Sequence, residues 1–229
     1  MERKPGITAL TPSSRLLRVA LTAALIAAVL PNLRGQGIDI ERTLKGVENR
    51  YNKAQTLDVM FSETYSLKGR KRVEKGELFL RKPGRMRWQY SEPPGKLFVS
   101  DGKFVYFSSP QENRAEKMKL NVTDDMRAPL AFLLGGLEFH KDFKEFQAKS
   151  IDDGLFVTAI PKSDKFPYSE VSFVTTPDFA IRRLYVKYQD NSTIEFDFDN
   201  EKRNPVLPET MFRFTPPPGA EYVDSSKQQ

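Results

Sequence analysis

The alternation of apolar and polar residues in short runs between turns constrains the fold of this chain most strongly. Leu57, Val59, Phe61 and Tyr65 alternate with Asp58, Ser62 and Thr64, and Lys68-Gly69-Arg70 then supplies a turn. An apolar residue at every second position is typical of a strand with one buried face. Similar runs predict further strands at 73–81, 85–90, 96–100, 104–108, 114–120, 143–150, 155–160, 169–175, 181–188, 193–199 and 211–214. Short strands joined by tight turns favour antiparallel pairing.

Two helices are expected besides these strands. Residues 38–51 carry apolar side chains two to four positions apart among charged ones, which is the pattern of an amphipathic helix. Residues 126–134 follow two aspartates and end at Gly135-Gly136, as a capped helix with a glycine stop would. Two helices can cover such a sheet only in part. The pattern therefore predicts a mainly β fold with α elements, an unclosed antiparallel β-barrel of about 11 strands with a helical lid over an apolar cavity.

The N-terminus predicts export. Arg15 and Arg18 precede twelve uncharged, mostly apolar residues, 19–30, and Pro31 ends the run. As a helix, this run would be about 18 Å long, against roughly 30 Å for the hydrocarbon core of a membrane. We expect a signal peptide at 1–35 that is cleaved near Gln36, and one domain at 36–229. A permanent membrane anchor is the alternative.

Charge and cysteine content exclude several classes of function. The whole chain has a net charge of +6, but residues 1–35 hold five basic residues and one acidic residue, which leaves +2 for 36–229. A polyanionic partner such as nucleic acid is therefore not indicated. The absence of cysteine removes disulfides, thiolate nucleophiles and acylation of an N-terminal cysteine.

No residue pattern predicts catalysis. His140 is the only histidine, and without a nucleophile beside it we expect it at the surface. Asp197 and Asp199 share a strand face, which suits either a carboxylate pair or, as we favour, a solvated face. Gly135-Gly136 lacks the spacing of a phosphate loop. We expect no catalytic residue, no metal, no cofactor and no enzymatic activity.

The run Arg85–Tyr90 is more informative. Alternation places Met86, Trp88 and Tyr90 on one face and two arginines on the other, which we expect to meet water or lipid headgroups. The apolar row either fills the core or lines a cavity, and spacing does not separate the two.

Three blocks of sequence resemble the outer-membrane lipoprotein carrier family, LolA. The blocks are GELFLRKPGRMRW at Gly76–Trp88 with the following Pro93, VSDGK at Val99–Lys103, and FRFTPP at Phe212–Pro217. The resemblance extends over the first helix and over APLAFLL at Ala128–Leu134, which is similar to the family's lid.

The resemblance implies a periplasmic carrier. Such a protein binds the acyl chains of lipoproteins, takes them from an inner-membrane lipoprotein-releasing ABC transporter, and passes them to an outer-membrane lipoprotein receptor. The expected partners are these three, with no nucleic acid, and a monomer is the default. The residues expected to line the cavity are Phe61, Leu78, Leu80, Met86, Trp88 and Tyr90. The residues expected to form the lid are Leu130, Phe132 and Leu133.

The chain departs from the family at the position implied in latching the lid. The family usually has arginine directly before the proline, where this chain has Lys82, with Arg81 one place earlier. Lysine offers a point charge in place of the planar fork of arginine donors. We expect Lys82 or Arg81 to latch the lid.

Three other functions remain open on sequence alone. A periplasmic carrier of free lipid or glycolipid would use the same architecture. A secreted lipid hydrolase would need a nucleophile and base that are not apparent. An envelope-stress sensor would keep the apolar N-terminal segment as its anchor.

Overall fold

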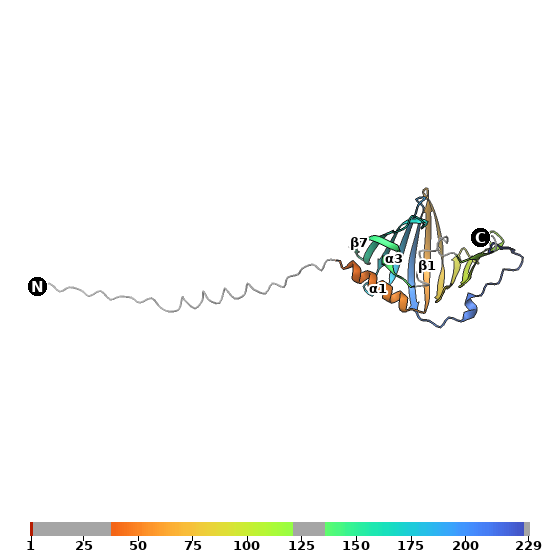
Figure 1. Cartoon of the computed structure of the whole chain (residues 1–229), viewed down its shortest axis with the longest axis horizontal. Helices are drawn as coiled ribbons and strands as arrows, with labels where there is room; N and C mark the ends of the chain where they lie inside the picture. Colours follow the sequence, from red (N-terminus) through yellow and green to blue (C-terminus); the bar gives the residue numbers. More distant parts are fainter. Residues whose placement is uncertain (2–37, 121–135, 227–229) are drawn as a thin grey trace. The chain divides into compact units, whose positions relative to one another are not determined.

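The computed structural model describes Met1, residues 38–120 and residues 136–226. Twelve strands form one sheet in the order β12-β6-β5-β4-β3-β2-β1-β11-β10-β9-β8-β7 (Figure 1). The strands are β1 (Thr56–Leu67), β2 (Arg70–Arg81), β3 (Arg85–Glu92), β4 (Leu97–Asp101), β5 (Phe104–Ser109), β6 (Arg114–Lys119), β7 (Phe143–Ile151), β8 (Gly154–Pro161), β9 (Tyr168–Thr175), β10 (Ile181–Tyr188), β11 (Thr193–Arg203) and β12 (Glu221–Asp224). The predicted mainly β, unclosed fold is confirmed.

Consecutive strands pair as antiparallel hairpins, as the tight turns predict. β1 to β6 form one run and β7 to β11 another, and the pairing of β1 with β11 joins them. In the first run, Leu78 of β2 lies opposite Val59 of β1 and Trp88 of β3, and Trp88 lies opposite Phe98 of β4. This register gives the sheet an apolar inner face and a more polar outer face.

Helix α1 (Ile40–Lys53) crosses one end of the sheet (Figure 1). It begins at Asp39, whose carboxylate accepts a hydrogen bond from the Arg42 N–H at 2.9 Å, as an N-cap residue does. Leu44, Val47 and Tyr51 lie on its buried face. A second, short helix, α3 (Phe139–Asp142), directly precedes β7. In the part of the chain that the structure describes, no helix has the length and apolar character needed to span a bilayer.

The core lies on the inner face. Its largest fully buried side chains include Trp88, Phe98, Phe173 and Phe196 from four different strands. Burying a side chain of this size contributes roughly 1.5–3 kcal/mol, so this face supplies most of the driving force for folding. The predicted signal peptide, 1–35, and the predicted lid helix, 126–134, lie outside the described residues.

The C-terminal part differs from the prediction. No strand forms at 211–214, where a 3-10 helix, η2 (Glu209–Phe212), lies against β3 and β4. Prolines on both sides of η2 cannot donate ladder hydrogen bonds, so this segment does not join the sheet. The last strand is β12, which brings the count to twelve and pairs with β6 in parallel, the one exception to the antiparallel pattern.

The outer face of β3 is also not solvated as expected. Arg87 donates from Nη1 to the carbonyl oxygen of Met211 at 3.1 Å, and Arg85 forms an ion pair with Glu209 at 3.2 Å. The two arginines therefore hold η2 in place. Phe212, the last residue of η2, is buried, with 2% of its surface exposed.

Candidate functional site

The six residues predicted to line a cavity come together on the inner face of β1, β2 and β3. None of them has more than 4% of its surface exposed: Phe61, Leu78, Leu80, Met86, Trp88 and Tyr90. Register places Leu78 opposite Trp88 and Leu80 opposite Met86. The structure thus forms them into one apolar patch, and contact of this patch with a ligand stays a prediction.

A glycine allows three aromatic rings to pack within this patch. The ring of Phe61 lies 4.8 Å from that of Trp88 and 5.2 Å from that of Tyr90, both in edge-to-face contact. Between them, Gly76 has no room for a side chain. A Cβ there would lie 2.3 Å from the carbonyl oxygen of Gln89 and 2.9 Å from the ring of Phe61.

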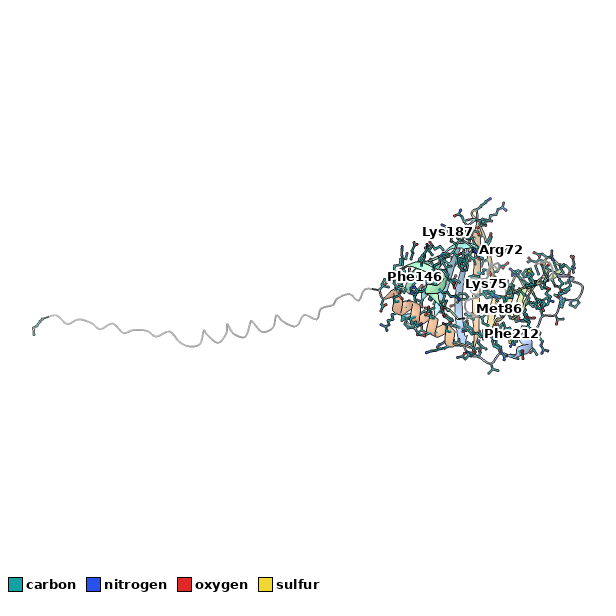
Figure 2. All side chains as sticks on the ribbon, viewed as in Figure 1. Arg72, Lys75, Met86, Phe146, Lys187 and Phe212 are labelled. Atoms are coloured by element: carbon teal, nitrogen blue, oxygen red, sulfur yellow. The ribbon has the colours of Figure 1, made fainter. Side chains whose placement is uncertain are left out.

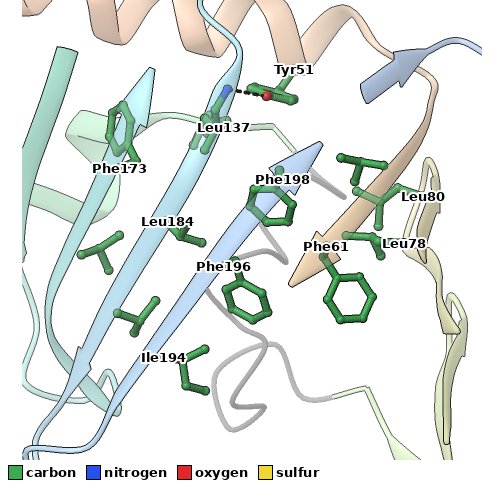
Figure 3. Close-up of a cluster of buried hydrophobic side chains, with 14 of the residues drawn as sticks. Tyr51, Phe61, Leu78, Leu80, Leu137, Phe173, Leu184, Ile194, Phe196 and Phe198 are labelled. Atoms are coloured by element: carbon green, nitrogen blue, oxygen red, sulfur yellow. Dashed lines mark hydrogen bonds between the residues drawn. The ribbon is translucent and has the colours of Figure 1, made fainter. Parts of the chain in front are cut away.

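The patch continues onto β11, which is far from β1 in the sequence but pairs with it in the sheet. Phe196 lies 5.6 Å from Trp88, centroid to centroid, and stacks on Phe198 at 5.9 Å. Figure 3 shows Phe61, Phe196 and Leu184 directed into the same space. The alternation over 193–199 predicts the strand, but only the pairing of β1 with β11 brings its phenylalanines to the site.

Two narrow clefts lie between α1 and the inner face, and each has a volume of about 10 Å³. The first is almost wholly apolar and is lined by Tyr51, Leu57, Val59, Leu78, Ile181, Leu184, Phe198 and Glu201. A single water molecule needs roughly 10–15 Å³. Neither cleft, as it stands, has room for an acyl chain.

Hydrogen bonds hold α1 against the strands. The Tyr51 hydroxyl donates to Oε2 of Glu201 at 2.7 Å. It accepts from the N–H of Ile181 at 2.8 Å (Figure 3). Burial raises the pKa of Tyr51, and the charge of Glu201 raises it further, so the hydroxyl keeps its proton. Arg50 binds the other oxygen of Glu201 at 2.6 Å.

The two candidate latch residues contact different parts of the molecule. Lys82 donates from Nζ to the carbonyl oxygens of Tyr51 at 2.7 Å and of Asn52 at 3.2 Å, at the C-terminal end of α1. A cation is favourable at the negative end of a helix dipole, although burial lowers the pKa of Lys82. Arg81 donates to the carbonyl oxygen of Leu207 at 2.9 Å. Their latching of a lid stays a prediction.

A groove on the outer face has a mixed polar and apolar lining. It has a volume of about 810 Å³, and Met60, Glu77, Gln89 and Asp199 are among its lining residues. Met60, Glu77 and Gln89 lie side by side on adjacent strands. This mixed lining suits an acyl chain less well than the inner face does.

The residues that the sequence analysis considered for catalysis lie beside oppositely charged side chains. His140 is exposed, as predicted, and lies 2.9 Å from Oε2 of Glu41. Asp197 pairs with Arg183, and Asp199 lies 3.5 Å from Arg182. Among the residues that the structure describes, no group of three or more histidines and carboxylates could hold a metal ion.

Comparison with known proteins gives a consistent result. The family model described as "Outer membrane lipoprotein carrier protein LolA" matches residues 52–215. An outer-membrane lipoprotein carrier protein of Chromobacterium violaceum is 27% identical over 205 residues, which cover 89% of this chain and 95% of the relative. That of Nitrosomonas europaea is 26% identical over 182 residues, covering 79% and 88%.

Comparison with solved structures gives matches at low sequence identity. An uncharacterised conserved protein from Thermus thermophilus superposes with a TM-score of 0.50 at 11% identity, covering 82% of this chain and 99% of the other. A LolA superfamily protein from Nitrosomonas europaea superposes with a TM-score of 0.44 at 8% identity, covering 78% and 99%.

Proposed function

This chain belongs to the outer-membrane lipoprotein carrier family, LolA, and we propose that it shuttles lipoproteins through the periplasm. It is a carrier and not an enzyme, as the family and its named members are. In this proposal the chain receives the acyl chains of a lipoprotein from an inner-membrane ABC transporter. It then delivers them to an outer-membrane receptor, and its N-terminal segment, 1–35, directs its export.

The continuous apolar inner face is the observation that carries this proposal. Phe61, Leu78 and Trp88 lie on three adjacent strands, and Phe196 and Phe198 continue the patch across β11. Each methylene removed from water contributes roughly 0.8 kcal/mol, so acyl chains of a dozen or more carbons cannot cross the periplasm uncovered. A sheet with one apolar face can cover them without any chemical step.

The closed clefts beneath α1 fit a carrier that must also release its cargo. Opening them breaks the hydrogen bonds of Tyr51 and separates α1 from Ile181 and Glu201. The free energy needed to open the clefts lowers the affinity for acyl chains. A receptor whose apolar surface is already open therefore takes the cargo without an energy source on this chain.

Release of a lipoprotein from the inner membrane tests this proposal. The full chain is exported by its host, purified, and added to spheroplasts that hold a radiolabelled triacylated lipoprotein. We expect label in the soluble fraction as a one-to-one complex with the chain. Heat-unfolded chain is the control.

Failure of release with folded chain and active transporter would contradict the lipoprotein function. Lipid extraction from the purified chain, followed by mass spectrometry, would then identify a carrier of free lipid or glycolipid.

We also propose that Leu130, Phe132 and Leu133 form a lid and that Lys82 or Arg81 latches it. Leu133→Glu is then expected to weaken binding of an apolar dye while leaving the circular dichroism spectrum native. Unchanged dye binding by this variant would contradict the lid assignment.

A further inference from the structure

Two glutamates lie at the far end of the apolar inner face, where a carrier of hydrocarbon has no evident need for them. Glu63 of β1 and Glu74 of β2 lie directly opposite one another. They have 8% and 5% of their surfaces exposed. Figure 2 shows nearby Arg72 at the end of the sheet where β1 and β2 turn, and Figure 1 shows α1 at the other end.

Cations surround Glu74 but not Glu63. Lys96 donates from Nζ to Oε2 of Glu74, and Arg72 lies 3.3 Å from its Oε1. The same Lys96 Nζ lies 4.2 Å from the ring centroid of Tyr90, in a cation–π contact. Glu74 is therefore neutralised within the protein.

Glu63 accepts one hydrogen bond, to Oε2 from the Tyr90 hydroxyl at 3.1 Å. Among the described residues, its Oε1 has no hydrogen-bond partner and no ion pair. Part of the Glu63 surface, 8%, stays exposed, so a donor from outside the described residues can reach this uncommitted acceptor oxygen. The free oxygen thus marks a position where a donor from outside the chain would be stabilised.

The position of Glu63 relates it to the apolar patch. Glu63 follows Phe61 by two residues on the same face of β1, and Tyr90 contacts both of them. A chain lying against Phe61 and Trp88 would therefore end beside the carboxylate. Ester groups offer only acceptors, whereas an N-acyl amide or an ammonium group offers an N–H donor.

We propose that Glu63 is a recognition point for an N–H donor at the polar end of a bound acyl chain. This inference rests on the proposed function, because it requires that acyl chains bind on the inner face. It adds chemical selectivity to that function. An amide-linked or amine-bearing chain binds more tightly than an ester of the same length.

Two ligands that differ at one atom test this inference. N-methyldodecanamide carries an N–H where methyl dodecanoate carries an oxygen, and both can be titrated into the full chain while the emission of Trp88 is recorded. A hydrogen bond to a charged group is worth roughly 1.5–3 kcal/mol, so we expect the amide to bind about tenfold or more tightly. Glu63→Leu is expected to remove the difference.

Glu63→Gln and Glu77→Leu complete the set of variants. Glutamine keeps a neutral acceptor, so we expect a preference that is reduced but not lost. Glu77 lies on the outer face of the same hairpin, and its replacement by leucine is expected to leave the preference intact. If Glu63→Leu fails to fold, the reduced preference of Glu63→Gln decides the question.

Equal binding of both ligands by the wild-type chain, or an undiminished preference in the Glu63 variants, would overturn the inference. If the wild-type chain binds neither ligand, that result would instead contradict the proposed function, and the inference with it.

Discussion

Single side chains decide how closely the strands of the inner face can approach one another. Gly76 is required because a Cβ at this position would meet the carbonyl oxygen of Gln89. Because glycine has no Cβ, the ring of Phe61 can pack against the rings of both Trp88 and Tyr90. Alternation in the sequence predicts that these aromatic residues share faces. It does not predict that the glycine opposite them makes their packing possible, because cross-strand register is not visible in one strand.

Trp88 offers a direct test of the apolar patch. It is the only tryptophan of the chain and is fully buried beside Phe61. Because heavy atoms quench indole emission on contact, we expect an acyl chain brominated near its middle to quench Trp88 in proportion to binding.

The control moves the indole to the outer face by Trp88→Phe combined with Tyr106→Trp. Tyr106 stacks on Phe214, away from the inner face. Quenching that is equal in the two proteins would show that acyl chains do not bind at the patch.

Glu77 provides a test of pH dependence on the outer face. Burial raises its pKa, and a hydrogen bond and the charge of Asp58 raise it further. The folded chain then holds this proton more tightly than the unfolded chain. Stability is therefore lost as pH rises from the ordinary value of a glutamate through the raised pKa.

We expect Glu77→Gln, which resembles the protonated form, to lose this pH dependence. The variant should be more stable than the wild type near neutral pH, by less than about 1 kcal/mol because the site is partly solvated. Urea unfolding between about pH 4 and 7 measures both proteins. Parallel pH curves would rule out the assignment to Glu77.

At the scale of whole elements, the turns make most of the fold predictable. β1 to β11 lie where alternation and turn residues place them, because each hairpin is determined by residues close together in the sequence. The predicted strand at 211–214 is wrong because alternation there reflects a different environment. Phe212 is buried against the outer face, and its neighbours bind arginine side chains in place of a strand. Contacts between residues so far apart in sequence leave no local pattern.

Helix α1 is hydrogen-bonded to the segment that leads into α3, which is distant from it in the sequence. The Asn52 side chain donates to the carbonyl oxygen of Leu137 at 2.8 Å and accepts from its N–H at 2.6 Å. One turn earlier, Glu48 accepts from the N–H of Phe139 at 2.9 Å. The residues that lead into α3 are thus attached to the helix at two points.

We expect Asn52→Ala to speed hydrogen exchange at the Leu137 amide. Losing a buried hydrogen-bond partner costs roughly 1–3 kcal/mol, which corresponds to a rate increase of about 5- to 150-fold. Asn204→Ala is the matched control, because Asn204 accepts from the N–H of Gln55. An unchanged Leu137 rate in Asn52→Ala would mean that this segment is held by other contacts.

At the scale of the whole molecule, the proposed function makes the affinity for acyl chains depend on the free energy of opening the clefts beneath α1. Tyr51→Phe leaves the Ile181 N–H and one Glu201 oxygen without their partner. We expect the folded chain to lose about 1–3 kcal/mol of stability in urea unfolding. The same loss lowers the cost of opening the clefts beneath α1, so acyl chains should bind several-fold more tightly.

Tyr185→Phe is the control for this change. The Tyr185 hydroxyl accepts from Arg183 at 3.3 Å on the outer face, where it does not contact α1. Weaker acyl binding by Tyr51→Phe would show that the contacts of α1 support the bound form and do not oppose it.

The linear order of the sheet, from β12 to β7, has a consequence for the range of cargo sizes. In a barrel that closes on itself, strand number and stagger determine the radius, so the interior is a container of fixed capacity. A sheet with two separate margins can unroll by small changes of twist between neighbours, without breaking any ladder hydrogen bond. Under the proposed function, such a sheet can therefore accommodate acyl groups of different bulk by changing its curvature.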